Sequence, residues 1–251
     1  MAAGKFNSNL TLFSDLDGTL IFSAARKQVG DIVIERKDGR EISCITARQA
    51  ELFPKLRNVI PVTTRSVEQY RRIEFAQFGF EPQYALCANG GVLLVDGVPD
   101  AAWSERSREI YRECEAELSG FRERLESDPR RSFEVRLVDG LFLFTKSAEP
   151  SETLRYLGEG ELCKSFFTGE KVYVIPKKLN KGAAVKQLAE RLELSAFAAA
   201  GDSLMDLPML NASYTAIFTD NIPEDEVTAH EKTVRPREGF AEFVTEAACS
   251  C

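Results

Sequence analysis

One stretch of the sequence decides the fold: Leu10-Thr11-Leu12-Phe13-Ser14-Asp15-Leu16-Asp17-Gly18-Thr19, an apolar run that ends in two carboxylates one residue apart. The apolar run predicts a strand, and open α/β sheets carry their chemistry at the carboxyl ends of their strands. Side chains alternate along an extended chain, so Asp15 and Asp17 point to opposite sides and can take different roles, while Gly18 lets the chain turn away. An Asp-rich turn that only caps a strand looks the same, so the rest of the sequence has to decide.

Two further predicted strands end in polar residues. Val59–Val62 runs into Thr63-Thr64-Arg65, and Ala196–Ala200 runs into Gly201-Asp202-Ser203. Because strands alternate with helices along the chain, these ends are expected to meet at one edge of a parallel sheet. These strand ends therefore favour a catalytic edge over an Asp-rich turn that only caps a strand.

Two predicted helices carry charges at their beginnings. Lys181 precedes a helix expected over Gly182–Leu192, with Asn180 as its N-cap. A cation there opposes the helix dipole, so Lys181 is either a solvated side chain or one that meets an anion. Asp206 would complement the dipole of a short helix expected over Leu204–Asn211.

At these places the chain resembles the haloacid dehalogenase (HAD) superfamily of phosphohydrolases. The four motifs of that superfamily match Asp15-Leu16-Asp17-Gly18-Thr19, Thr63, Lys181 and Gly201-Asp202-Ser203-Leu204-Met205-Asp206. The resemblance covers nearly the whole chain. It implies an α/β fold with a Rossmann-like parallel-sheet HAD core.

The resemblance also implies a role for each motif residue. Asp15 would attack phosphorus and form an aspartyl phosphate, and Asp17 would protonate the leaving oxygen and then deprotonate the hydrolytic water. Thr63 and Lys181 would hold phosphoryl oxygens, and Asp202 would bind Mg²⁺ together with Asp15 and the backbone carbonyl of Asp17. The chemistry asks for the same residue types, because phosphoryl transfer depends on positioning and charge neutralisation and Mg²⁺ prefers oxygen ligands.

Residues beside the motifs are secondary candidates. Thr63 and its neighbour Thr64 could each supply the hydroxyl of the second motif. Thr63 is the preferred candidate because the family pattern places that hydroxyl two residues before the Arg. The closest subgroup commonly has Asn before the last Asp of the fourth motif, where this chain has Met205. Met offers no hard oxygen, so any water-mediated role of that Asn is missing or falls to Ser203. The secondary candidates are Thr64, Arg65, Asn89, Ser203 and Asp206.

The middle of the chain predicts a separate unit. A long helix is followed by two short strands, a helix near Glu152–Leu157 and two more strands. The long helix is predicted from apolar residues that recur at helical spacing: Ile110, Cys114, Leu118, Phe121 and Leu125. The predicted strands are Phe133–Leu137, Leu141–Lys146, Cys163–Thr168 and Lys171–Ile175.

An insertion at this place resembles the α/β cap of HAD subclass IIB, the group of Cof-type, sucrose-phosphatase-like and trehalose-phosphatase-like sugar phosphatases. The Asn89-Gly90 pair matches the passage from core to cap in that group. The expected domains are a catalytic core of residues 1–90 and 177–251 and a cap domain of residues 91–176. The cap cations that could read the leaving group, or lie solvated at the surface, are Arg131, Arg136, Lys146 and Lys164.

A β-hairpin is expected directly after the first motif, as an insertion over about residues 26–46. Asp38-Gly39 is a strong two-residue turn signal between Asp31–Glu35 and Arg40–Cys44. Such a hairpin could act as a flap over the site, as a docking edge for a second subunit, or as plain surface elaboration.

Composition favours an enzyme of small metabolites. The 251 residues, 44% hydrophobic and 28% charged, suffice for one α/β core and a smaller domain, and the net charge of −7 argues against nucleic acid as a partner. No apolar stretch approaches the length of a membrane span, and Met1–Asn9 lacks the apolar segment of a signal peptide.

Cysteine and histidine usage narrows the chemistry. The six cysteines are scattered along the sequence and lack the paired spacing of a zinc site. Cysteines of this kind are typical of a protein in the reduced cytoplasm. Cys249 and Cys251 could bind a metal or oxidise, although fraying of a terminus accounts for them as well. His230 is the one histidine and lies in a polar segment away from the motifs, so acid-base work is expected to fall to carboxylates.

We therefore expect a cytoplasmic, Mg²⁺-dependent phosphatase that hydrolyses a small phosphorylated metabolite, a sugar phosphate in the first instance, through an aspartyl-phosphate intermediate. Neither nucleic acid nor membrane is an expected partner, and the protein is expected to be a monomer or a homodimer. Two alternatives stay open: a phosphomutase of the phosphomannomutase type, and a non-catalytic regulator that binds a sugar phosphate.

Overall fold

The structure, a computed structural model, describes residues 10–249, so the expectations for Met1–Asn9 and Cys251 lie outside the described residues. Residues 10–98 and 181–249 form one compact unit, here called the core unit. Pro99–Asn180 forms a second, the inserted unit. Over the described part of the chain, no helix combines the length and the apolar character that crossing a membrane requires.

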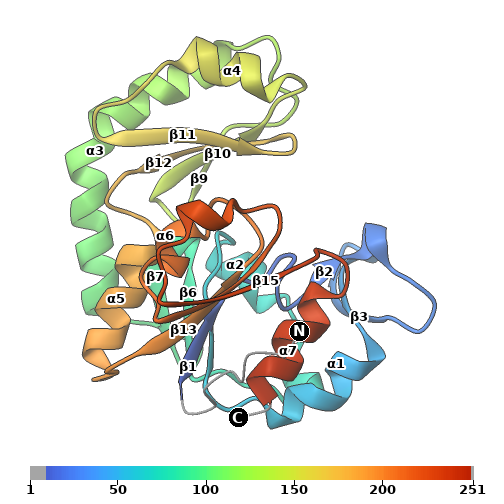
Figure 1. The fold of residues 1–251 in the computed structure, drawn as a ribbon. Helices are drawn as coiled ribbons and strands as arrows, with labels where there is room; N and C mark the ends of the chain where they lie inside the picture. Colours follow the sequence, from blue (N-terminus) through green and yellow to red (C-terminus); the bar gives the residue numbers. More distant parts are fainter. Residues whose placement is uncertain (1–9, 250–251) are drawn as a thin grey trace. The chain divides into compact units, whose positions relative to one another are not determined.

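Five parallel strands form the central sheet of the core unit (Figure 1), in the order β15-β14-β13-β1-β5. Ser14 at the end of β1 lies opposite Ala200 of β13 on one side and Pro61 of β5 on the other, so these strands end at the same level. The predicted α/β class with a parallel sheet is confirmed. The strands are β1 Thr11–Ser14, β5 Val59–Pro61, β13 Phe197–Gly201, β14 Thr215–Thr219 and β15 Glu231–Arg235.

Helices cover both faces of this sheet, α1 and α7 on one side and α5 and α6 on the other (Figure 1). Small side chains at Ala198 and Ala200 of β13 let Phe240 and Val244 of α7 pack into the same buried cluster. The helices of the core unit are α1 Ala47–Leu52, α2 Val67–Arg71, α5 Lys181–Arg191, α6 Leu207–Leu210 and α7 Phe240–Cys249. The chain also forms short 3₁₀ helices: η1 Ala24–Arg26, η2 Phe53–Lys55, η3 Phe75–Phe78, η4 Ala88–Gly90 and η5 Glu224–Glu226.

The helix predicted over Leu204–Asn211 is shorter than expected. Only Leu207–Leu210 is helical, and the residues before it form turns. The reason lies in Asp206, whose carboxylate accepts hydrogen bonds from the backbone N–H groups of Asp202 and Ser203 and so holds the preceding chain in a tight loop. Pro208 at the start of the helix fits this late beginning.

The hairpin predicted after the first motif is confirmed. β3 Ile32–Lys37 and β4 Arg40–Ile45 pair antiparallel, and β2 Phe22–Ser23 extends them to three strands. Asp38 and Gly39 both have positive φ, 50° and 76°, as a tight hairpin turn of this kind requires. A second antiparallel sheet joins β6 Tyr84–Cys87, β7 Val92–Val95 and β8 Val98–Pro99.

The inserted unit has the predicted order of helix, two strands, helix and two strands. Its antiparallel sheet runs β11-β12-β10-β9, and the helices α3 and α4 pack on one face of it (Figure 1). Phe121 of α3 lies in a buried cluster with Leu143 and Val174 of the sheet. The expected strand Phe133–Leu137 begins later, at Arg136. The elements are α3 Ala101–Ser127, β9 Arg136–Val138, β10 Phe142–Lys146, α4 Pro150–Leu157, β11 Cys163–Thr168 and β12 Lys171–Pro176.

Gln49 of α1 ties the turn after the first motif to the helices beneath it. Its buried Nε2 donates to the carbonyl oxygens of Leu20 and Ala241, at 2.9 and 3.1 Å, and to Oγ1 of Thr245 at 2.9 Å. Its Oε1 accepts from the backbone N–H of Thr46, which completes a capping box.

We expect Gln49→Glu to lower the free energy of unfolding by about 2–4 kcal/mol, because it replaces a buried donor with a carboxylate that faces three acceptors. Urea titration measures the change. Gln69→Glu is the matched control, since Gln69 forms the same capping box with Ser66 at the start of α2, and a Glu at that position keeps the acceptor. Equal losses for the two variants would contradict this role of Gln49.

Candidate active site

The ends of β1 and β13 bring the first and fourth motifs together. The backbone N–H of Asp15 donates to the carbonyl oxygen of Ala200, and Asp202 follows two residues later in the chain. Gly18 makes the close approach possible: its φ is +95°, and a Cβ there would lie 2.2 Å from Oδ2 of Asp202. Only a residue without a side chain fits at this point, so the glycine of the first motif has a steric reason.

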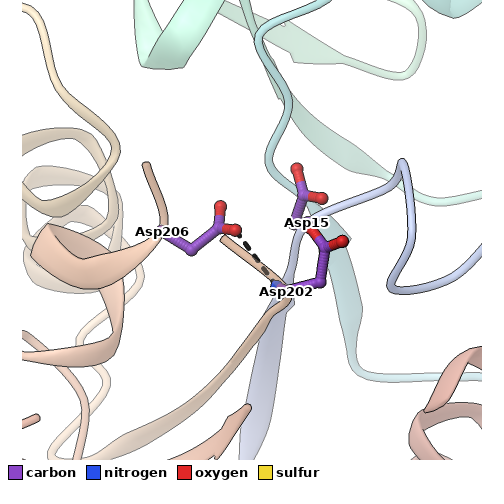
Figure 2. Close-up of side chains that lie close together, drawn as sticks. All are labelled: Asp15, Asp202 and Asp206. Atoms are coloured by element: carbon purple, nitrogen blue, oxygen red, sulfur yellow. Dashed lines mark hydrogen bonds between the residues drawn. The ribbon is translucent and has the colours of Figure 1, made fainter. Parts of the chain in front are cut away.

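Three aspartates gather at this edge of the sheet (Figure 2). Asp15, Asp202 and Asp206 each offer one carboxylate oxygen, and these oxygens lie within 4.8 Å of one another. All three side chains are buried. Oxygen ligands at this spacing fit a hard divalent cation.

The predicted cation of the third motif lies within this cluster. The Nζ of Lys181, only 2% exposed, is 2.5 Å from Oδ1 of Asp15 and 2.6 Å from Oδ1 of Asp206. Burial opposes the positive charge, but the two carboxylates outweigh it, so the pKa of Lys181 is raised above its usual range. Of the two interpretations of Lys181, the anionic partner is therefore confirmed.

Asp206 is engaged by both of its oxygens. Oδ1 accepts from Lys181, while Oδ2 accepts from the backbone N–H groups of Asp202 (Figure 2) and Ser203 and from the Ser203 hydroxyl. Metal coordination by Asp206 would compete with these hydrogen bonds. Asp206 is thus arranged to hold Lys181 and the loop of the fourth motif, and Asp15 and Asp202 are better placed as ligands.

The charges of the cluster are not balanced by protein groups alone. Burial raises the pKa of Asp15 well above its usual value; Lys181 lowers it, while the neighbouring aspartates raise it further. Burial and then Asp206 raise the pKa of Asp202 to about 6, against the opposing effect of Arg237. A nucleophilic Asp15 has to be ionised, so positive charge in addition to Lys181 suits this site. The residues present therefore fit Mg²⁺.

Asp17 lies on the other side of the strand end and is held by Arg65. The guanidinium makes a bidentate pair with it, Nε to Oδ2 and Nη2 to Oδ1, both at 2.7 Å. The side chain of Asp17 is 50% exposed while that of Arg65 is 11% exposed. Burial opposes the charge of Arg65, but its hydrogen bonds and Coulombic attraction to Asp17 raise its pKa. A fixed, accessible carboxylate is what a proton-transfer group needs.

Thr63 follows β5 and is buried. Its Oγ1 accepts from the backbone N–H of Arg65 at 3.1 Å, and its carbonyl oxygen accepts from the backbone N–H of Asn89 at 2.8 Å. The hydrogen bond between Asn89 and Thr63 joins the Asn89-Gly90 turn to the second motif. Within this turn, η4, Asn89 has a φ of +59°. Thr64, the residue after Thr63, is partly buried. A backbone hydrogen bond also joins the first motif to the second: the backbone N–H of Val62, beside Thr63, donates to the carbonyl oxygen of Ser14, beside Asp15, at 2.7 Å.

Some residues with contacts to the site do not stand out in the sequence. Glu35 and Ser43 of the hairpin bond to Arg65, and Thr219 donates to the carbonyl oxygen of Asp202. Nη2 of Arg237 lies 3.5 Å from Oδ2 of Asp202. Glu35 carries the one usable signal, a charged side chain directly after the apolar run Ile32-Val33-Ile34.

Comparison with solved structures finds the same fold at low sequence identity. The sucrose-phosphatase of Synechocystis sp. PCC6803, solved in complex with sucrose and phosphate, has a TM-score of 0.66 at 19% identity, over 95% of this chain and 97% of that one. A haloacid dehalogenase-like hydrolase from B. subtilis has a TM-score of 0.57 at 19% identity, over 94% and 99%. The C-terminal domain of C. albicans trehalose-6-phosphate phosphatase has 0.56 at 15%, over 94% and 91%.

Among curated proteins, none matches this chain significantly. The model of the sucrose-6F-phosphate phosphohydrolase family matches residues 8–248. Since that match spans nearly the whole sequence, the protein belongs to this family of the HAD superfamily and is a phosphatase of phosphate monoesters.

Proposed function

We propose that this protein is a Mg²⁺-dependent phosphatase that hydrolyses a sugar phosphate through an aspartyl phosphate on Asp15. The observation that carries the proposal is the pairing of two carboxylates in different surroundings. Asp15 is buried beside Lys181, whereas Asp17 is half exposed and held by Arg65. Environments that differ in this way let one carboxylate act as nucleophile and the other as proton carrier.

In the first step an oxygen of Asp15 forms a bond to phosphorus while the bond from phosphorus to the bridging ester oxygen breaks. That oxygen keeps the electron pair and takes a proton from Asp17, so the sugar leaves as an alcohol. In the second step Asp17 takes a proton from water as the water oxygen attacks phosphorus and Asp15 is released. Thr63 and Lys181 are suited to hold phosphoryl oxygens during both steps.

The residues that would hold Mg²⁺ are the carboxylates of Asp15 and Asp202 and the backbone carbonyl of Asp17. When bound there, the cation supplies positive charge for the phosphoryl oxygens and offsets the repulsion between carboxylates and substrate. Asp206 keeps Lys181 in place through the 2.6 Å hydrogen bond to Nζ. Ser203 donates its hydroxyl to Oδ2 of Asp206 at 3.0 Å and so supports the loop of the fourth motif.

A sugar phosphate is supported by the family and by the printed identities of two relatives, a sucrose-phosphatase and a trehalose-6-phosphate phosphatase. We also propose that the core unit is the catalytic domain and the inserted unit its cap. The sheet face opposite α3 and α4 suits a sugar, since Phe144 and Phe166 both pack against Tyr173 there. Cations on or near this sheet are Arg131, Arg136, Lys146 and Lys164.

Cellular setting and assembly are also part of the proposal. A reduced cytoplasm is supported by the cysteines between residues 10 and 249, none of which takes part in a disulfide. The net charge of −7 supports a small phosphorylated metabolite over nucleic acid as the partner. The proposal is completed by a monomer or homodimer that does not bind a membrane.

We expect phosphate release from members of a panel of sugar phosphates and from p-nitrophenyl phosphate with Mg²⁺, and none with excess chelator, because Asp15 and Asp202 need the added positive charge. A colorimetric phosphate assay measures both arms. Chelator-insensitive release would contradict the metal requirement. Release that needs a sugar bisphosphate as activator would favour the phosphomutase, and sugar-phosphate binding without turnover would favour the regulator.

Asp15→Asn should reduce turnover by more than about 10³-fold with little change in stability, because it removes the nucleophile but keeps the volume. Steady-state phosphate release and thermal unfolding give the two values. Asp225→Asn, at an exposed position in η5, is the control and should retain wild-type turnover. Wild-type turnover in Asp15→Asn would rule out the covalent mechanism.

Gly18→Ala should reduce turnover by about 10²-fold or more, since its methyl group would displace the Asp202 carboxylate by an ångström or more. Gly30→Ala is matched to it: φ of Gly30 is +97°, yet nothing lies within 4 Å of the added Cβ. It carries the backbone strain without the clash. Equal activity losses in the two variants would show that strain, and not the approach to Asp202, explains Gly18.

A further inference from the structure

The hairpin after the first motif carries a fully buried carboxylate. Glu35 of β3 is 0% exposed, although its neighbours Arg36 and Lys37 are exposed. Its Oε2 accepts from the hydroxyl of Ser43 and from Nη1 of Arg65, both at 2.7 Å. Its Oε1 accepts from Nε of Arg72 at 3.1 Å. Two arginines of the core unit thus share one carboxylate of the hairpin.

An irregularity of the hairpin turns Glu35 inward. The β3–β4 register shifts between Val33 and Glu35 and again between Glu35 and Arg36. In a regular strand successive side chains alternate, but here Ile34 and Glu35 are both buried. Bulges re-aim side chains in this way and are frequent beside active sites. An isolated bridge between Glu35 and Ile73 fixes the re-aimed residue to the core unit.

The guanidinium of Arg65 connects Glu35 with Asp17. Its Nη1 donates to Glu35, its Nη2 to Ser43 at 3.0 Å and to Asp17, and its Nε to Asp17. Because the guanidinium is planar and its donors are rigidly spaced, fixing one edge fixes the other. The position of the Asp17 carboxylate is therefore set by a side chain of the hairpin.

Stability alone does not account for Glu35. Buried ion pairs contribute little to stability compared with apolar residues of similar volume, because removing two charges from water is costly. An apolar residue would continue the buried run of Val33 and Ile34 without that cost. A carboxylate is needed at this point only if the arginine has to be held.

We propose that Glu35 is a positioning residue for the proton-transfer group: it orients Arg65, and through Arg65 it holds the Asp17 carboxylate where the ester oxygen leaves. The inference rests on the proposed phosphatase mechanism, in which Asp17 gives its proton to that oxygen. On this proposal the hairpin is neither a movable flap nor plain surface elaboration. It is a fixed support of the active site.

The proposal predicts a loss that depends on the leaving group. A sugar alkoxide is a poor leaving group and needs a proton as the bond to phosphorus breaks, whereas p-nitrophenolate leaves without one. General acid catalysis is worth about 10²–10⁴-fold. We expect Glu35→Gln to lower kcat/KM for a sugar phosphate by about 10-fold or more, and kcat/KM for p-nitrophenyl phosphate by less than about 3-fold. The ratio kcat/KM is the correct quantity because it reports steps up to leaving-group departure and excludes hydrolysis of the aspartyl phosphate.

Glu41→Gln is the matched control, at an exposed position of β4 in the same hairpin, where Glu41 pairs with Lys27. It should leave both ratios unchanged. Loss of folded protein would lower kcat/KM for both substrates equally, so thermal unfolding first establishes that Glu35→Gln is folded. In the folded variant, equal losses with the two substrates overturn the proposal, as does wild-type activity with both. If Glu35→Gln does not fold, Ser43→Ala removes the hydroxyl that joins Glu35 to Arg65 and should show the same selectivity with a smaller loss.

A crystal structure of Glu35→Gln separates this proposal from the proposed function. We expect the guanidinium of Arg65 to leave its bidentate position on Asp17 in the variant and to keep it in the wild type. An unchanged pair in both overturns the positioning role, whatever the enzyme hydrolyses. A wild type that releases no phosphate from any substrate overturns the proposed function, while the crystal structures still decide the geometry.

Discussion

The buried ammonium of Lys181 is the interaction on which the rest of the site depends. It lies 2.5 Å from Asp15 and 2.6 Å from Asp206, and all three side chains are buried. A charge buried there with neither carboxylate would cost several kcal/mol, so Lys181 needs at least one of its two partners to stay buried. The cation also explains why Asp206 differs from Asp202: Asp206 holds the lysine, whereas Asp202 is the carboxylate that the proposed Mg²⁺ site would use.

The limited space at the strand ends is the second constraint, and glycines meet it because they have no side chain. A Cβ at Gly18 would meet the Asp202 carboxylate at 2.2 Å, and one at Gly201 would meet Cβ of Asp206 at 2.3 Å. Parallel strands end at one level, so the loops that leave β1 and β13 have to pass each other closely. The motif glycines are therefore required because the carboxylates are crowded at this edge. Their contribution to the chemistry is the space that they leave for these carboxylates.

Much of this arrangement could be predicted because the informative residues follow strand ends. Asp15, Thr63 and Asp202 each come after an apolar run, and parallel strands carry such residues to one edge. The hairpin was predictable from Asp38-Gly39, since turn chemistry is local. Glu35 was not: its burial depends on a register shift and on Arg72, and neither follows from periodicity. The helix over Leu204–Asn211 was predicted too long for a similar reason, because the side chain of Asp206 bonds backward to the chain before it and keeps that chain from becoming helical.

Two separate charge networks let neighbouring carboxylates behave differently. Asp15 belongs to an inner network with Lys181 and Asp206, whereas Asp17 belongs to an outer one with Arg65 and Glu35. Each network has its own cation, although the charge of Asp17 still acts on its neighbour and raises the pKa of Asp15. A hairpin inserted after the first motif can contribute Glu35 to the outer network because the insertion begins close to Asp17 in the sequence. Loops at such places tolerate insertion. The insertion thus adds a support for Arg65 and, through Arg65, for Asp17.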